Sequence, residues 1–154
     1  MVLASPSLKT RALRWLAQRE YSRAELQRKL QRHLQEGDDL DELLDDLERK
    51  DFINAERVAA SLVHQRGAAW GGQRVALELR RKGLDADLVR ATAADLAASE
   101  LQRAQALWRR RFAGAAPATP QERARHMRFL TARGYAFDVV RQVVPIVGGV
   151  EPEL

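Results

Sequence analysis

The 154-residue sequence is 45% hydrophobic and 6% aromatic, contains no cysteine and carries a formal net charge of +5. Disulfides and thiolate metal sites are thereby excluded, and no stretch approaches the roughly 18 apolar residues that a membrane span needs. Because residues 1–11 also lack the apolar core of a signal peptide, we expect a cytoplasmic protein that does not contact a membrane.

The first part of the chain predicts two helices that follow a flexible N-terminal arm at residues 1–7. Leucine, alanine and tryptophan recur on one face of residues 8–18, as in an amphipathic helix. Ser22 and Glu25 have the spacing of a capping box, in which each side chain accepts a hydrogen bond from the other residue's backbone N–H. A second helix therefore begins there, and we expect it to continue through Leu34.

The third predicted helix, capped by Asp39, is strongly acidic. Residues 36–51 contain nine acidic and two basic residues, which gives this segment a charge of −7 and the remainder of the chain +12. A basic body favours polyanions such as nucleic acid, or an acidic protein surface, as a partner. Carboxylates at Asp41, Asp45 and Asp46 can hold Mg²⁺, but a solvated face on a leucine-backed helix explains them better. We expect no cofactor.

The central stretch, residues 51–84, predicts two short helices joined by a glycine-marked corner. Asn54 is suited to cap the first of them, which ends at Arg66. Gly67 follows, a residue that tolerates the left-handed geometry often found after a helix. Trp70 stands in the corner and is expected to pack between helices rather than to stack on a base.

The second central helix has a basic end. The RRK run at 80–82, followed by Gly83, either complements the helix dipole or contacts a polyanion. Arg74 lies one turn before Glu78, so it either contacts a partner or forms an ion pair within the helix. Both alternatives stay open for both sites.

A later helix, the seventh, carries three consecutive arginines. Ser99 and Gln102 predict a second capping box at its start. The arginines at 109–111 lie between Trp108 and Phe112, so they point to solvent if the two aromatic side chains face the core. There they either contact phosphate or an acidic partner, or form a solvated charged face.

The end of the chain predicts two further helices. Glycine and proline interrupt residues 113–120, and Thr119 then caps a helix that has proline in its first position and ends at Gly134. A ninth helix is disrupted by Pro145, since proline cannot continue a helical hydrogen-bond pattern. Residues 148–154 are expected to form a flexible tail.

One pattern recurs, namely a helix that ends in a basic residue and glycine, followed by an acidic-capped helix. Residues 79–90 align with residues 130–141, and Gly37 takes the place of Gly83 in a weaker first copy. We therefore predict an all-α fold of three tandem three-helix repeats that form an elongated, curved array. The units are expected at residues 8–51, 52–98 and 99–147.

The most specific motifs recur in order along the chain: REYS at 19–22, DFIN at 51–54, RG at 66–67, WG at 70–71, ELRRKG at 78–83 and RGY at 133–135. In this order and spacing the sequence resembles the RecX family, bacterial regulatory proteins that act on the RecA recombinase. The resemblance covers nearly the whole chain. It implies that the protein binds the RecA–DNA filament and inhibits or modulates its extension, ATP hydrolysis and strand exchange, in recombination, DNA repair and SOS regulation.

The resemblance implies binding rather than catalysis, and the residues agree. His33, His64 and His126 are far apart in the sequence, and no nucleophile–base pair or phosphate-cradling glycine loop is present, so we do not expect an enzyme. A stand-alone basic DNA-binding protein that acts through phosphate contacts is the alternative. As partners we expect the RecA filament and single- or double-stranded DNA, contacted directly or through the filament, and we expect a monomer.

The residues selected from the sequence fall into two sets. The candidate contacts to RecA or DNA are Arg66, Arg74, Arg80, Arg81, Lys82, Arg109, Arg110, Arg111 and Arg133. The residues expected to be structural are Ser22, Glu25, Phe52, Ile53, Leu62, Trp70, Leu79, Gly83, Trp108, Leu130 and Gly134.

Overall fold

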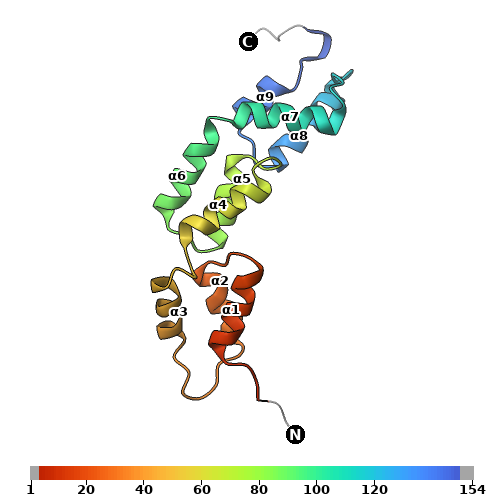
Figure 1. Cartoon of the computed structure of the whole chain (residues 1–154). Helices are drawn as coiled ribbons and strands as arrows, with labels where there is room; N and C mark the ends of the chain where they lie inside the picture. The colour runs from red at the N-terminus through yellow and green to blue at the C-terminus, as the bar shows by residue number, and fades with distance from the viewer. Residues whose placement is uncertain (1–3, 150–154) are drawn as a thin grey trace.

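The computed structural model describes residues 4–149, which form nine α-helices and no strand (Figure 1). The helices follow one another in three groups along an elongated, curved array, so the predicted all-α class is confirmed. The arm at 1–7 and the tail at 148–154 extend beyond the described residues, which leave out 1–3 and 150–154. The exact boundaries of the three units stay a prediction.

We call the three groups of helices unit 1, unit 2 and unit 3. Unit 1 contains α1 (Leu8–Gln18), α2 (Arg23–Gln31) and α3 (Leu40–Arg49). Unit 2 contains α4 (Ala55–Arg66), α5 (Gly72–Arg81) and α6 (Ala86–Ala97). Unit 3 contains α7 (Glu100–Phe112), α8 (Pro120–Ala132) and α9 (Phe137–Val143), with a short 3-10 turn, Val147–Gly149, after it.

Side-chain caps start most of these helices where the sequence places them. The Ser22 hydroxyl accepts from the Glu25 N–H, and the Glu25 carboxylate accepts from the Ser22 N–H, so this capping box is confirmed. The expected box at Ser99 is wrong. Its hydroxyl donates to the Leu96 carbonyl and accepts from Arg103 Nε, so it makes no bond to its own helix N-terminus. Caps of the expected kind also occur at Asp39, Asn54 and Thr119.

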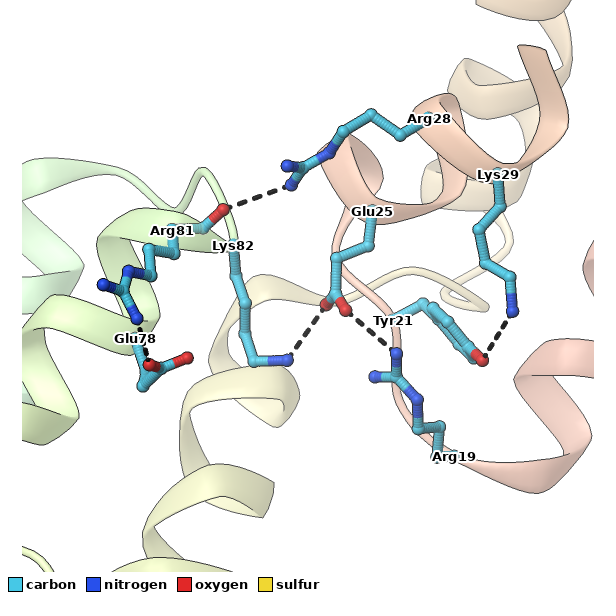
Figure 2. A pocket seen from close by; sticks show the side chains of 8 residues that line it. All are labelled: Arg19, Tyr21, Glu25, Arg28, Lys29, Glu78, Arg81 and Lys82. Carbon is cyan, nitrogen blue, oxygen red and sulfur yellow. Dashed lines mark hydrogen bonds and ion pairs between the residues drawn. The ribbon is translucent and has the colours of Figure 1, made fainter. Parts of the chain in front are cut away.

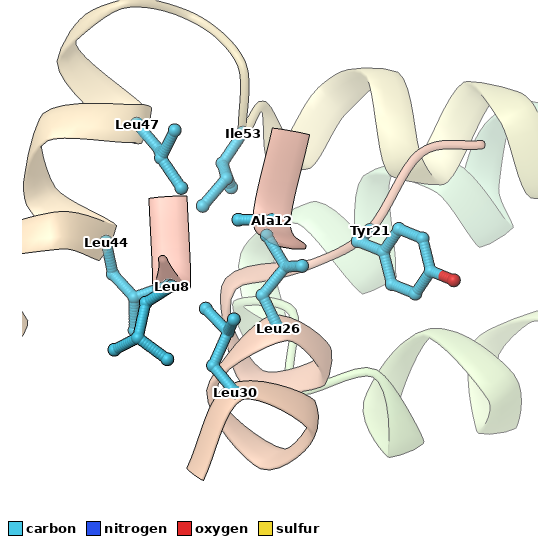
Figure 3. Packing of buried hydrophobic residues seen from close by; sticks show 8 residues of the cluster. All are labelled: Leu8, Ala12, Tyr21, Leu26, Leu30, Leu44, Leu47 and Ile53. Carbon is cyan, nitrogen blue, oxygen red and sulfur yellow. The ribbon is translucent and has the colours of Figure 1, made fainter. Parts of the chain in front are cut away.

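Each unit buries its own hydrophobic cluster, and Figure 3 shows that of unit 1. Burying one large aliphatic side chain contributes about 1.5–3 kcal/mol, so these small cores are the main source of stability within a unit. Unit 1 buries Leu8, Ala12, Tyr21, Leu26, Leu30, Leu44, Leu47 and Ile53. Unit 2 buries Ala59, Leu62, Val75, Ala76, Leu79, Val89 and Leu96. Unit 3 buries Ala104, Leu107, Trp108, Leu130, Tyr135, Val140, Val143 and Val144.

One predicted helix end differs from the structure. The second helix does not continue through Leu34, because it ends at Gln31 and leaves Leu34 in the following loop with 42% of its surface exposed. The predicted end of α4 at Arg66 is confirmed, but Gly67 does not use its left-handed freedom: its φ is −59°, and its N–H still donates to the Val63 carbonyl in the helical pattern. The corner after α4 therefore turns beyond this glycine rather than at it.

Phe52 was expected to be structural, and the structure corrects this expectation. Its side chain is 44% exposed, whereas the neighbouring Ile53 is buried in the core of unit 1. The backbone explains the difference, because Asp51 has a left-handed φ of 63° and the N–H groups of Phe52 and Ile53 both donate to the Leu47 carbonyl. This tight reversal buries Ile53 and leaves Phe52 at the surface.

The units are joined where their second helices, α2, α5 and α8, meet end to end. We call the contact between the start of α5 and the end of α8 junction 2. There the Gly71 N–H donates to the Arg133 carbonyl at 2.8 Å, and the Gln73 N–H donates to the Gly134 carbonyl at 3.2 Å. The unpaired donors of one helix start thus satisfy acceptors at the end of another helix.

We call the contact between the start of α2 and the end of α5 junction 1. Its hydrogen bonds come from side chains: Ser22 Oγ donates to the Lys82 carbonyl at 2.6 Å, and the Arg28 guanidinium donates to the Arg81 carbonyl at 3.1 Å. Lys82 Nζ also lies 3.2 Å from a carboxylate oxygen of Glu25. Three separate cores are therefore held in one array by hydrogen bonds at helix ends.

Candidate functional site

Arginines surround a tryptophan at the corner between α4 and α5. Trp70 is half-buried and packs on the core of unit 2. The guanidinium carbon of Arg66 lies 5.3 Å from the centroid of the Trp70 ring, and that of Arg74 lies 4.4 Å from it. Both distances suit a cation–π contact, so the ring gathers two positive charges at one place.

Unit 3 brings further arginines to this corner. Arg110 on α7 donates to the Ala68 carbonyl at 3.3 Å, and Arg74 donates to the Ala132 carbonyl of α8 at the same distance. The next residue, Arg133, lies with its guanidinium carbon 5.0 Å from the centroid of the Phe129 ring. The corner, the end of α7 and the end of α8 are therefore neighbours at junction 2.

Arg111 completes the group, since its guanidinium carbon lies 5.6 Å from the centroid of the same Phe129 ring. Within the described part of the chain, none of these five arginines forms an ion pair. Their positive charges are left available to a polyanion or an acidic surface. We call Arg66, Arg74, Arg110, Arg111 and Arg133 the basic cluster.

Arg103 binds the backbone of the corner that carries Trp70, and the sequence did not predict this role. One guanidinium nitrogen donates to the Gly67 carbonyl at 2.6 Å and to the Trp70 carbonyl at 2.7 Å, and another donates to the Leu96 carbonyl at 3.1 Å. This one side chain ties α7 to the α4–α5 corner. No local signal distinguishes it from the exposed arginines, because its acceptors are carbonyls that the fold brings together.

The remaining candidate contacts lie elsewhere. Arg81 is 2.8 Å from a carboxylate oxygen of Glu78, so Glu78 pairs with Arg81 rather than with Arg74, and the alternative of an ion pair between Arg74 and Glu78 is wrong. Lys82 is only 21% exposed and pairs with Glu25 at junction 1. Two others, Arg80 and Arg109, are exposed.

The arginines of α7 lie above a buried aromatic layer that contains a histidine. Trp108 is buried, and its indole N–H donates to His126 Nδ1 at 3.0 Å. The Phe112 ring stacks on the imidazole with centroids 3.7 Å apart. Burial, reinforced by the charge of Arg125, lowers the pKa of His126, so the imidazole is neutral and remains an acceptor at neutral pH. No pattern in the sequence predicted that this histidine would be buried.

Neither a metal-binding group of side chains nor a membrane-spanning helix is found in the part of the chain that the structure describes. Among residues 4–149, no three histidine, aspartate or glutamate side chains are grouped as a metal would require, and the carboxylates of α3 are no exception. None of the helices described here combines the length and the apolar character needed to cross a membrane.

Comparison with known proteins gives a consistent result. A sequence model of the third three-helix domain of RecX matches residues 98–144, and one of the second matches residues 54–92. The regulatory protein RecX of Leptothrix cholodnii is 48% identical over 138 residues, which is 90% of this chain and 87% of that protein. That of Herbaspirillum seropedicae is 46% identical over 136 residues, 88% of each chain.

A solved structure supports the fold. The crystal structure of RecX from Lactobacillus salivarius superposes with a TM-score of 0.69 and covers 88% of this chain and 91% of that one. At 19% sequence identity, this likeness concerns the arrangement of the helices alone.

Proposed function

Since this chain belongs to the RecX family of regulatory proteins, we propose that it binds the RecA–DNA filament and inhibits or modulates its extension, ATP hydrolysis and strand exchange. This activity serves recombination, DNA repair and SOS regulation in the cytoplasm. The protein acts as a monomer that occupies the filament, and its regulatory effect comes from binding rather than from chemistry on a substrate.

The observation that carries this proposal is the basic cluster. Five guanidinium groups from units 2 and 3 meet at junction 2, and no carboxylate of the described chain neutralises them. Arginine presents its donors in a planar fork that matches phosphate and carboxylate oxygens. A surface of this kind suits both components of the filament, namely the DNA backbone and the acidic side chains of a protein.

The elongated shape supports the same function. Three units in a row present their surfaces over a length that a single compact domain of this size does not reach (Figure 1). Several weak contacts on one scaffold add through effective concentration once the first contact forms. The array therefore suits a long, repetitive partner better than a small ligand.

The test is DNA-dependent ATP hydrolysis by the cognate RecA, with this protein titrated in at fixed single-stranded DNA. We expect inhibition well below one protein per RecA protomer. No inhibition, together with tight and salt-sensitive binding to bare DNA, would contradict the proposal in favour of a stand-alone DNA-binding protein.

A further inference from the structure

A second basic site lies at junction 1, at the opposite end of α5 from the basic cluster. A groove between the start of α2 and the end of α5 has a volume of about 370 Å³, and Figure 2 shows the side chains that line it. Tyr21, Glu25 and Glu78 contribute to its lining. Its cationic lining residues are Arg19, Arg28, Lys29, Arg81 and Lys82.

The two carboxylates of the groove are already neutralised. Glu25 lies 3.0 Å from Arg19 and 3.2 Å from Lys82. Burial opposes its ionisation, but the Ser22 N–H and these two cations hold the pKa of Glu25 below its ordinary value. Glu78 is paired with Arg81. Five cations against two carboxylates leave the groove with three uncompensated positive charges.

The partners of the other cations carry no charge. Arg28 donates to the backbone carbonyls of Ala24 and Arg81, and Lys29 Nζ donates to the Tyr21 hydroxyl at 3.3 Å. These bonds fix the two side chains along the groove without neutralising them (Figure 2). Glu25 shows that an oxyanion fits here, because its carboxylate is held by two cations and a backbone N–H.

We propose that this groove binds a phosphate group, supplied either by the backbone of a nucleic-acid strand or by a free polyphosphate. The ligand-contacting side chains are Arg28 and Lys29, whose partners carry no charge, and Arg81, whose side chain is 66% exposed although it pairs with Glu78. Lys82 and Arg19 are engaged with Glu25, which is largely buried. The site is separated from the basic cluster by the length of α5, whose 10 residues span about 15 Å. It does not rest on binding to RecA.

The test compares two double variants with equal changes of charge. Arg28→Gln/Arg81→Gln removes two cations from the groove, and Arg14→Gln/Arg90→Gln removes two exposed cations elsewhere. Arg90 is a suitable control because it pairs with Asp87 three residues away, as Arg81 pairs with Glu78. The probes are a fluorescein-labelled single-stranded oligonucleotide, followed by anisotropy at several salt concentrations, and inorganic tripolyphosphate, followed by calorimetry. No RecA is present.

We expect the groove variant to bind the oligonucleotide about three- to tenfold more weakly, with a salt dependence shallower by about one to two units. The control keeps the wild-type affinity. Parallel loss of tripolyphosphate binding identifies a site for free phosphate as well, whereas loss for the oligonucleotide alone identifies the strand as the source. Equal affinities of both variants for both probes would overturn the proposal.

A second measurement uses the wild-type chain, so it does not depend on the stability of a variant. On titration with the oligonucleotide, the backbone amide resonances of Arg28, Lys29 and Arg81 should shift in parallel and saturate. If they do not move while other resonances do, phosphate binds elsewhere and the groove is not the site.

Discussion

Junctions 1 and 2 occupy the same place in the repeat, yet they are built differently. In each, the N-cap of one second helix meets the C-terminal end of another. At junction 2 the N-cap is Gly71, and backbone donates directly to backbone. At junction 1 the N-cap is Ser22, and its hydroxyl reaches the Lys82 carbonyl with help from Arg28.

This difference determines what each junction presents to a partner. A Cβ atom on Gly71 would overlap the backbone of Gly134, so the helix ends at junction 2 touch without a side chain between them. Arg66 and Arg74 of unit 2 contact the Trp70 ring there, and arginines of unit 3 lie beside them. At junction 1 side chains link the two helix ends and line a groove. Junction 2, where the N-cap is glycine, thus carries the basic cluster. Junction 1, where the N-cap is serine, carries a basic groove.

The largest expected effect comes from three left-handed glycines, two that follow the ends of α8 and α5 and one in the loop between α2 and α3. Gly134, Gly83 and Gly37 all have a positive φ, so alanine costs about 1 kcal/mol at each from backbone strain alone. At Gly134 the new Cβ also overlaps the backbone of Arg74, and we expect a total loss of about 3–4 kcal/mol.

The other two glycines serve as graded controls. At Gly83 the new Cβ meets only the Ala24 Cβ, at 2.8 Å, and we expect a loss of about 2 kcal/mol. Nothing lies within 4 Å at Gly37, so only the strain remains. Urea unfolding of the three alanine variants measures the order. Equal losses at Gly37 and Gly134 would show that close approach at junction 2 contributes nothing.

The next effect concerns Arg103, which belongs to junction 2 alone. Replacing it with methionine keeps the apolar stem and removes the donors to the Gly67, Trp70 and Leu96 carbonyls. We expect a loss of about 2–3 kcal/mol in urea unfolding, because partly buried acceptors lose charge-assisted bonds. Arg109→Met on the same helix is the control and should change stability little. Equal losses of stability in the two variants would show that the bonds from Arg103 to these carbonyls do not stabilise junction 2.

A smaller effect is expected at Ser22. Its hydroxyl caps α2 and also bonds across junction 1, whereas the Thr119 hydroxyl only caps α8. Ser22→Ala should therefore cost about 1.5–2.5 kcal/mol and Thr119→Ala about 1 kcal/mol. Thermal unfolding of the two variants gives the comparison, and a larger loss for Thr119 would mean that the Lys82 carbonyl is not stabilised by this bond.

The smallest expected effect is a difference between the two junctions in how their stability changes at low pH. Burial of Glu25 is outweighed by the Ser22 N–H, Arg19 and Lys82, so its pKa lies below the ordinary 4.5. Its stabilising contribution is therefore complete above about pH 4.5 and is lost as the pH falls through the lower folded value. At junction 2 the bonds from Gly71 to Arg133 and from Gln73 to Gly134 join backbone groups, which do not titrate, although the Glu100 carboxylate accepts from the neighbouring Gly72 N–H at 2.8 Å.

Amide hydrogen exchange between pH 6 and pH 3, corrected for the intrinsic rate, checks this asymmetry. Protection at the end of α5 should fall with the pH before protection at Gly71 falls. In Glu25→Gln the early loss should disappear, because glutamine keeps the shape but does not titrate. An early loss that persists in this variant would assign it to another group.

Local chemistry predicted much of the fold. Ser22 with Glu25, and Thr119 before Pro120, mark helix starts through bonds within four residues, and glycine marks the ends at Gly83 and Gly134. The failed capping box at Ser99 has a local cause that its spacing rule does not include. The Ser99 hydroxyl accepts from Arg103, four residues later, and donates to the Leu96 carbonyl.

The candidate site was predictable only in part. The runs at 80–82 and 109–111 looked equivalent in the sequence, yet Arg81 and Lys82 have carboxylate partners, whereas Arg110 and Arg111 face none in the described chain. Arginines of unit 3 come close to the two at Trp70 because the end of α8 meets the start of α5, a long-range contact that leaves no local signal.

The central claim is that the basic cluster at junction 2 binds the filament. The most direct measurement is the affinity of two triple variants for preassembled RecA–DNA filaments. One variant is Arg66→Gln/Arg110→Gln/Arg111→Gln, and its matched control, with the same loss of charge from exposed positions in unit 1, is Lys9→Gln/Arg14→Gln/Arg32→Gln. We expect at least tenfold weaker binding and lost ATPase inhibition for the cluster variant alone. Equal weakening of both would contradict the account.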